Sequence, residues 1–178
     1  MIAVVSGLPR SGTSMMMQML EAGGMSILTD GVRGPDRFNP WGYYELDRVK
    51  DLNRDVSWLR DAEGCAVKVI SALLCRLPPG REYKVIFMRR DIDTVYASQA
   101  RMLGEELTGA ASEREMKAHL RRHLDRVRRR ADERGDMDVL PCPYEGVVGN
   151  PEVWSLRIAR FLGVPLEEHR MAEAVDPR

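Results

Sequence analysis

MIAVVSGLPRSGTSMMMQML, residues 1–20, places a glycine-rich loop between two apolar runs. The first run, residues 2–5, is short, rich in β-branched residues and closed near a glycine, which is typical of a buried strand. The second run is rich in methionine and predicts a largely buried helix directly after the loop. A strand, a glycine-rich loop and a helix in this order form the setting of a phosphate-binding P-loop.

The loop has the glycine spacing of a Walker A motif but lacks its lysine. Four residues separate Gly7 from Gly12, and Thr13 and Ser14 stand where a lysine and a hydroxyl residue are usual. The cation comes earlier, at Arg10. Backbone N–H groups of the loop and of the helix N-terminus can still bind a phosphate. We therefore expect a phosphate site without the lysine that reaches the β/γ-phosphates of a nucleoside triphosphate, rather than a plain glycine turn.

This loop resembles a known phosphosulfate-binding sequence. Residues 9–14 are similar to the 5′-phosphosulfate loop of sulfotransferases, which use 3′-phosphoadenosine 5′-phosphosulfate (PAPS), and the arginine variant is similar to the tyrosylprotein and bacterial branches. The resemblance implies that Arg10 lies beside the phosphosulfate, near its bridging oxygen. It also implies that the donor is bound by Pro9, Arg10, Ser11, Gly12, Thr13 and Ser14.

A second phosphate-binding pattern follows the strand predicted over residues 83–88. Arg90 lies at the strand end, and Ser98 follows eight residues later, slightly over two helical turns away. Arginine is a planar bidentate donor that suits a dianionic phosphate better than lysine does. The spacing resembles the 3′-phosphate motif of the same family. If one nucleotide contacts both Arg10 and Arg90, the first strand and this strand must be neighbours in a parallel sheet.

Further segments extend the resemblance over nearly the whole chain. Residues 144–151, YEGVVGNP, are similar to the family segment that follows the last core strand, which implies that Tyr144 lies near the adenine. An aromatic side chain with a solvated hydroxyl is the equal alternative for Tyr144. Residues 39–45, NPWGYYE, resemble a pattern of small bacterial sulfotransferase-like proteins, and residues 161–165, FLGVP, resemble the family's closing pattern.

The catalytic groups are where the sequence departs from the family. Cytosolic members carry a catalytic histidine shortly after the position of Lys68, and here Val69, Ile70 and Ser71 stand there. The glycine-rich C-terminal 3′-phosphate loop of those members is also absent. Lys68 itself lies near the end of a strand predicted over residues 66–70, where it is expected to assist the donor.

Glu45 is the carboxylate that we expect to act as general base. It falls in the first turn of a helix predicted over residues 43–53, after a Gly-, Pro-, Asp- and Asn-rich loop long enough to line an acceptor pocket. The aromatic side chains that would shape this pocket are Trp41, Tyr43 and Tyr44. The tyrosylprotein branch also uses a glutamate as base. The alternatives are that Glu45 only complements the helix dipole, and that the base is Asp30 or Asp36.

A long charged helix is predicted over residues 113–134, with a narrow apolar stripe and many arginines that suggest a solvated basic face. His119 and His123 are one turn apart on this helix, a spacing that can bind a metal. No glutamate stands between them in the metalloprotease manner and no third ligand is evident in the sequence, so we expect no metal site.

Composition and charge argue against several other classes of protein. The chain has 178 residues, 44% of them hydrophobic, and no net charge, so the whole molecule is no electrostatic match for nucleic acid. No apolar run approaches the ~20 residues of a membrane span, and no signal peptide is evident. The three scattered cysteines favour reduced thiols in a cytoplasmic protein. We expect a single domain over residues 1–178.

Alternating strands and helices predict a three-layer α/β/α P-loop domain with a mostly parallel central sheet. The expected function is that of a sulfotransferase, which moves a sulfuryl group from PAPS to a hydroxyl or amine acceptor and releases 3′,5′-ADP without a metal. The acceptor would be a small molecule, a carbohydrate or a peptide. The alternatives are a P-loop nucleotide kinase or NTPase, and a nucleotide-binding protein without transfer activity.

Overall fold

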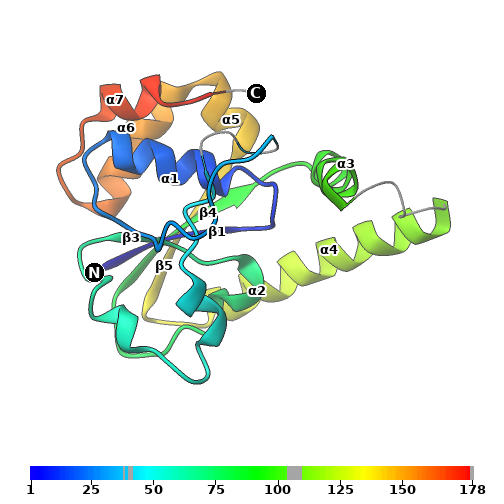
Figure 1. The fold of residues 1–178 in the computed structure, drawn as a ribbon, viewed down its shortest axis with the longest axis horizontal. Coiled ribbons are helices and arrows are strands. Elements are labelled where there is room, and N and C mark those ends of the chain that lie inside the picture. The colour runs from blue at the N-terminus through cyan, green and yellow to red at the C-terminus, as the bar shows by residue number, and fades with distance from the viewer. Residues whose placement is uncertain (38, 40–41, 104–109, 177–178) are drawn as a thin grey trace.

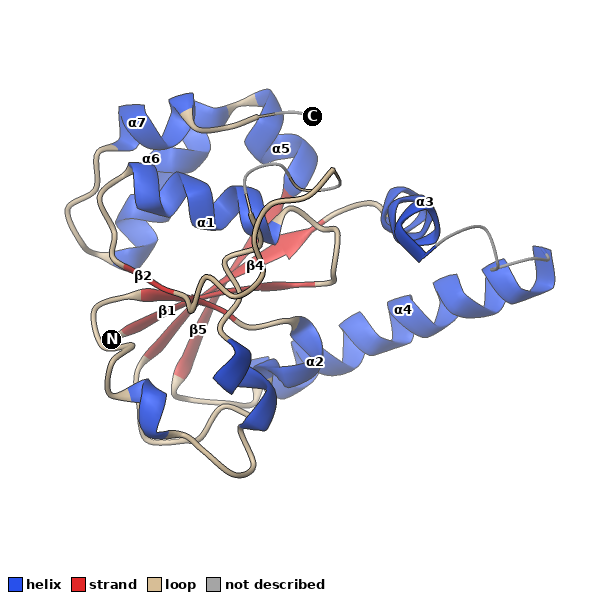
Figure 2. Ribbon diagram, in the orientation of Figure 1, coloured by secondary structure: helices blue, strands red, loops and turns tan. Residues whose placement is uncertain are grey.

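The computed structural model describes residues 1–37, 39, 42–103 and 110–176. They form a five-stranded parallel sheet with helices on both faces, as Figures 1 and 2 show. The strand order is β2-β3-β1-β4-β5. The strands are β1 (Ile2–Gly7), β2 (Ile27–Leu28), β3 (Ala66–Lys68), β4 (Tyr83–Arg89) and β5 (Met137–Pro143). The predicted three-layer α/β/α class is confirmed.

The first strand occupies the centre of the sheet. In β1, Val5 pairs with Lys68 of β3 on one side and with Ile86 of β4 on the other, and every pairing is parallel. The predicted adjacency of the first strand and the strand that precedes Arg90 is therefore confirmed. Because parallel strands end at one edge of a sheet, the glycine-rich loop, Lys68 and Arg90 follow neighbouring strand ends.

Alternate residues of the strands supply two separate cores. Ile2 and Val4 of β1 face one core, whereas Ala3 and Val5 face the other, because successive side chains of a strand point to opposite faces. One face is covered by α1 (Thr13–Ala22), α5 (Tyr144–Gly149), α6 (Pro151–Leu162) and α7 (Glu168–Glu173). The other is covered by the short 3-10 helices η1 (Asp47–Asp51) and η2 (Ser57–Leu59), and by α2 (Ser71–Leu74) and α4 (Ala110–Asp132).

Two helices extend beyond the edge of the sheet at which the strands end, on the right of Figure 1. They are α3 (Ile92–Leu103) and the first half of α4. A small apolar cluster of Leu8, Val95 and Leu120 ties both helices to the glycine-rich loop. Asp91 begins α3 as an N-cap, since its carboxylate accepts the backbone N–H of Thr94 at 2.9 Å.

The helix predicted over residues 43–53 is wrong in extent and type. Only η1 forms there, and Glu45 lies before it in extended backbone rather than in a first helical turn. Tyr44 has a φ of 52°, which interrupts any right-handed helix. The carbonyl of Glu45 instead accepts the N–H of Asp30 at 3.2 Å and the hydroxyl of Thr29 at 2.8 Å. Long-range pairing thus replaced the local helix.

Several other helices differ from the predicted ones in number or in where they begin. The sequence did not predict η2, α5 or α7, and α4 begins at Ala110, slightly earlier than expected. Residues 104–109, part of the connection expected before this helix, lie outside the described residues, and so does Trp41. Within the part of the chain that the structure describes, no helix is both long and apolar enough to span a bilayer.

Candidate active site

The loop from Gly7 to Gly12 turns tightly from β1 into α1. Gly7 and Gly12 have φ values of 148° and 94°, and Arg10 has a φ of 74°. A Cβ atom at Gly12 would lie 2.5 Å from Cδ2 of Tyr144, so only glycine fits this position without displacement. The Ser11 hydroxyl donates to the Leu8 carbonyl at 2.7 Å and closes the turn from inside.

The N-terminus of α1 offers donors for an anion. No side chain caps this helix, and its first turn has no acidic residue. Its free N–H groups and positive dipole end therefore suit a phosphate or phosphosulfate. Ser14 stands in this turn, and its Oγ accepts hydrogen bonds from Lys68 Nζ at 3.1 Å and from Asn39 Nδ2 at 3.0 Å.

The two predicted phosphate-binding groups form one cluster. Arg10 Nε donates to Ser98 Oγ at 2.9 Å, and Arg90 Nη1 donates to the Arg10 carbonyl at 3.3 Å. Gln99 adds a third link, since its amide donates to the Pro9 carbonyl at 3.0 Å. Segments about 80 to 90 residues apart in sequence thus bring their cations to one place.

Arg90 also contacts Tyr144. Its guanidinium carbon lies 4.0 Å from the centroid of the Tyr144 ring, in cation–π geometry. Its Nε is buried and has no hydrogen-bond partner among the described residues. A buried donor without a partner is costly, and an anionic ligand would satisfy it. The arrangement therefore suits an anionic ligand such as a phosphate.

Lys68 sits at the end of β3, beside the loop. Only 8% of its surface is exposed, and Nζ donates to the Tyr43 carbonyl at 2.7 Å as well as to Ser14. Burial lowers the pKa of Lys68 to about 8; Glu45 opposes this shift, whereas Arg33 and Arg10 add to it. This ammonium group is therefore mainly charged at neutral pH and loses its proton above about pH 8.

Glu45 lies near this lysine but is committed to an ion pair. Its Oε1 lies 3.1 Å from Arg33 Nη1, and Arg33 in turn stacks 3.5 Å from the centroid of the Tyr43 ring. The Tyr43 hydroxyl donates to Asp36 at 2.7 Å. Backbone N–H groups of Asp47 and Val32 lower the pKa of Asp30. The three carboxylates considered as bases therefore all have partners within the loop.

Sequence reasoning missed several polar groups near the site. Arg33 and Asn39 lie in the loop that the sequence marked as functional, but nothing in their spacing indicated their partners. Ser71 and His123 form a side-chain hydrogen bond of 2.9 Å between α2 and α4. These two residues are 52 positions apart, so no local pattern could have paired them.

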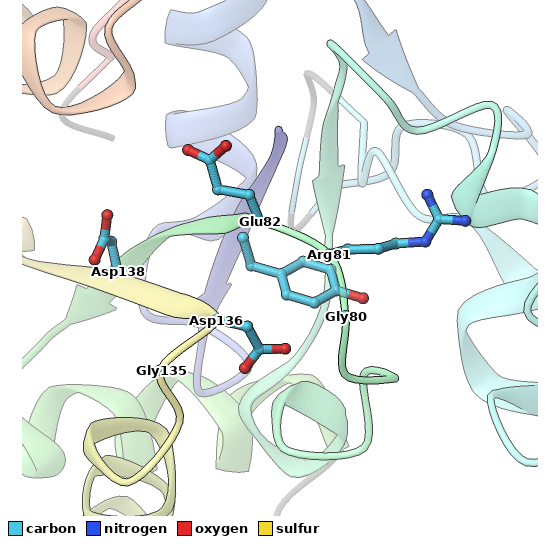
Figure 3. A pocket seen from close by; sticks show the side chains of 7 residues that line it. Gly80, Arg81, Glu82, Gly135, Asp136 and Asp138 are labelled. Atoms are coloured by element: carbon cyan, nitrogen blue, oxygen red, sulfur yellow. The ribbon is translucent and has the colours of Figure 1, made fainter.

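One hollow adjoins this cluster and another lies apart from it. A cavity of about 820 Å³ lies between α4 and the ends of β4 and β5, and Arg90 contributes to its wall. A smaller one of about 280 Å³ lies at the opposite edge of the sheet, around Tyr83 and Asp136 (Figure 3). None of the residues predicted for the site lines the smaller hollow. Among the described residues, no group of three or more His, Cys, Asp or Glu side chains could hold a metal ion.

Comparison with known proteins decides the family. A model of the sulfotransferase family matches residues 68–168, more than half of the chain. The chain belongs to the sulfotransferase family. The predicted membership of this family is thereby confirmed, although the matched range begins after the glycine-rich loop. Sulfuryl transfer is the general reaction that this membership supports. No curated protein sequence gives a significant match.

Solved structures of sulfotransferases share the fold. A Mycobacterium tuberculosis H37Rv sulfotransferase is 16% identical, with a TM-score of 0.60 over 96% of this chain and 70% of that one. A Mycobacterium avium sulfotransferase is 17% identical, with a TM-score of 0.63 over 99% and 68%. The sulfotransferase domain of the Synechococcus PCC 7002 olefin synthase is 20% identical, with a TM-score of 0.54 over 99% and 80%.

Proposed function

We propose that this sulfotransferase uses PAPS as donor, transfers its sulfuryl group to a hydroxyl or amine, and releases 3′,5′-ADP. The observation that carries the proposal is the cluster of Arg10, Ser98 and Arg90, which joins the glycine-rich loop to the end of β4. A nucleotide with phosphates on both its 5′ and 3′ positions matches two adjacent cationic sites. The proposal takes residues 1–178 as one domain that acts in the cytoplasm on a small molecule, carbohydrate or peptide.

The loop and the N-terminus of α1 bind the 5′-phosphosulfate in this scheme. Pro9, Ser11, Gly12 and Thr13 supply the loop backbone, while Ser14 adds a hydroxyl. Arg10 faces the oxygen that bridges phosphorus and sulfur, and it stabilises the negative charge that develops there as the bond breaks. Arg90 and Ser98 hold the 3′-phosphate, and Tyr144 lies beside the adenosine.

Lys68 and Glu45 complete the proposed site, next to the loop that binds the donor. Lys68 contacts Ser14 and assists the donor as a second cation. Glu45 opposes the fall of the Lys68 pKa and so favours its charged form. We expect Glu45→Gln to lower the transfer rate by roughly tenfold or more. At a pH well below the pKa of Lys68 the variant should keep the affinity for 3′,5′-ADP, because Lys68 then stays charged.

A kinase or NTPase is the main competing function. It needs a carboxylate at a strand end to hold Mg²⁺. The candidate is Asp91, and its carboxylate is engaged in capping α3. A sulfuryl group carries less charge than a phosphoryl group, so Arg10, Lys68 and the loop amides can suffice without a metal in the proposed reaction.

Thermal melts with three nucleotides test the proposed function. We expect 3′,5′-ADP to stabilise the protein by about 2.7 kcal/mol at a hundredfold excess over its dissociation constant. The 5′-ADP molecule should stabilise it much less, because it lacks the group that Arg90 and Ser98 bind. Equal shifts with both would refute two phosphate sites, and a larger shift with ATP–Mg²⁺ would favour the kinase. Transfer of labelled sulfate from PAPS then separates an enzyme from an inactive binder.

A further inference from the structure

The contact between Ser71 and His123 is a polar feature of the described residues that the proposed function leaves without a role. Ser71 is the first residue of α2 and only 2% exposed, and its Oγ lies 2.9 Å from His123 Nε2. The second ring nitrogen of His123 has no hydrogen-bond partner among the described residues. The imidazole is thus fixed through one nitrogen and available through the other.

The neighbours of His123 connect it to segments of the donor site. Ser71 follows Lys68 by three residues, and Lys68 reaches Ser14 at the start of α1. On the other side, Leu120 and Leu124 flank His123 on α4, and both belong to the apolar cluster around Leu8 of the glycine-rich loop. His123 is therefore held between the end of β3 and that loop.

An exposed apolar side chain lies in the same segment, directly after β3. Ile70, between Lys68 and Ser71, is 37% exposed although it is large and hydrophobic. An exposed isoleucine beside a buried lysine suits contact with the apolar part of an organic acceptor. An acceptor that lies over Ile70 would bring its hydroxyl between the loop and α4.

We propose that His123 is the catalytic base of the transfer reaction and that Ser71 is its positioning residue. This inference rests on the proposed function. When Nε2–H donates to Ser71, the lone pair on Nδ1 is free to take the acceptor's proton. As the acceptor oxygen bonds to sulfur, the bond from sulfur to the bridging oxygen breaks. That oxygen leaves with the electron pair on 3′,5′-ADP, and the proton moves from the acceptor to His123.

The surroundings of His123 favour its neutral, basic form. Burial lowers its pKa, and the nearby charges of Arg126 and His119 on the same helix lower it further. The packed helix α2, with the sequence Ser-Ala-Leu-Leu, carries no ionisable side chain that would oppose this. Glu45, by contrast, has its Oε1 engaged in an ion pair with Arg33.

The first test needs no acceptor. Titration of the histidine ring C–H signals by NMR, assigned with His119→Gln and His123→Gln, should place the pKa of His123 below the ordinary value for a histidine, because burial lowers it. Saturation with 3′,5′-ADP should shift the His123 signal and raise its pKa, because the bound anion lies nearby. The exposed His119 signal should stay unchanged. A His123 signal that does not respond to bound nucleotide would overturn the inference, whereas absence of nucleotide binding would instead overturn the proposed function.

The second test is the pH profile of sulfate transfer from PAPS to 2-naphthol and to tyramine. His123→Gln should lower the rate by roughly 10²–10⁴-fold and abolish the acid limb of the profile. The matched control His119→Gln should leave both unchanged. Ser71→Ala should lower the rate less and keep the acid limb, since the base remains. An acid limb that survives in His123→Gln and disappears in Glu45→Gln would assign the base to Glu45 and refute the inference.

Discussion

Arg90 stacks on Tyr144, donates to the Arg10 carbonyl and keeps a buried Nε without a partner among the described residues. We expect Arg90→Ala to abolish the preference for 3′,5′-ADP over 5′-ADP, because the donor for the 3′-phosphate is lost. Arg89, the exposed neighbour at the end of β4, is the matched control, and Arg89→Ala should keep the preference. Calorimetric titration of both nucleotides measures this. An unchanged preference in Arg90→Ala would remove Arg90 from the nucleotide site.

Lys68 predicts a pH dependence of nucleotide affinity. With its pKa at about 8 in the free protein, Lys68 is charged below this pH and neutral above it. A bound anion raises that pKa, so affinity should be constant below pH 8 and fall about tenfold by pH 9. The dissociation constant of 3′,5′-ADP, measured by calorimetry between pH 7 and 9, tests this. Lys68→Arg keeps its charge and should give a flat profile; a wild-type profile that is also flat would contradict the prediction.

At the residue scale, the sequence predicted the cations of the site but few of their contacts. Arg10, Arg90 and Ser98 were predictable because loop spacing and helical spacing are local properties. The ion pair of Glu45 with Arg33 was not, because it depends on a loop whose backbone pairs with residues 29 and 30. The Ser71–His123 contact depends on how α2 and α4 pack, which no spacing encodes.

The turn from β1 into α1 can be tested with a pair of glycines. Gly12 and Gly24 have nearly equal φ values, 94° and 91°, but an added Cβ would meet Tyr144 at Gly12 and nothing within 4 Å at Gly24. Gly24→Ala should cost about 1–2 kcal/mol of stability for its left-handed backbone. Gly12→Ala should cost about 1–3 kcal/mol more, since Tyr144 must shift. Urea unfolding of both variants measures this difference in stability. Equal losses of stability would show that the Tyr144 side chain can move aside at no cost.

Among the elements, those with a strong local period were predictable. The strands β1 and β4 are mostly apolar runs between turn residues, and the ranges predicted for them, 2–5 and 83–88, lie within their observed bounds. The failures occurred where tertiary contacts outweighed local preference. Before η1, the positive φ of Tyr44 prevents the helix that the local sequence favours. The short helix α5, which was not predicted, begins at Tyr144 directly after β5. Short helices of this kind are stabilised by packing rather than by propensity.

For the molecule as a whole, the fold class followed from alternating strand and helix signals, whereas the sheet order followed only in part. The neighbourhood of β1 and β4 was inferred from the need for one nucleotide to contact two arginines. The positions of β2 and β5 at the edges were not, because edge and central strands differ by context rather than by local sequence. The chain has no net charge, yet the cluster at the strand ends gathers Arg10, Arg33, Lys68 and Arg90 close together.

The central position of β1 also governs how the chain can fold during synthesis. Among the strands of this sheet, β1 is synthesised first, and it cannot pair until its neighbours β3 and β4 appear, more than 55 residues later. Such non-local pairing slows folding. We expect ribosome-bound nascent chains to stay sensitive to protease until β4 has left the exit tunnel. Limited proteolysis of stalled chains of increasing length tests this, and a resistant fragment that ends before Tyr83 would show that β1 finds a stable arrangement without its second partner.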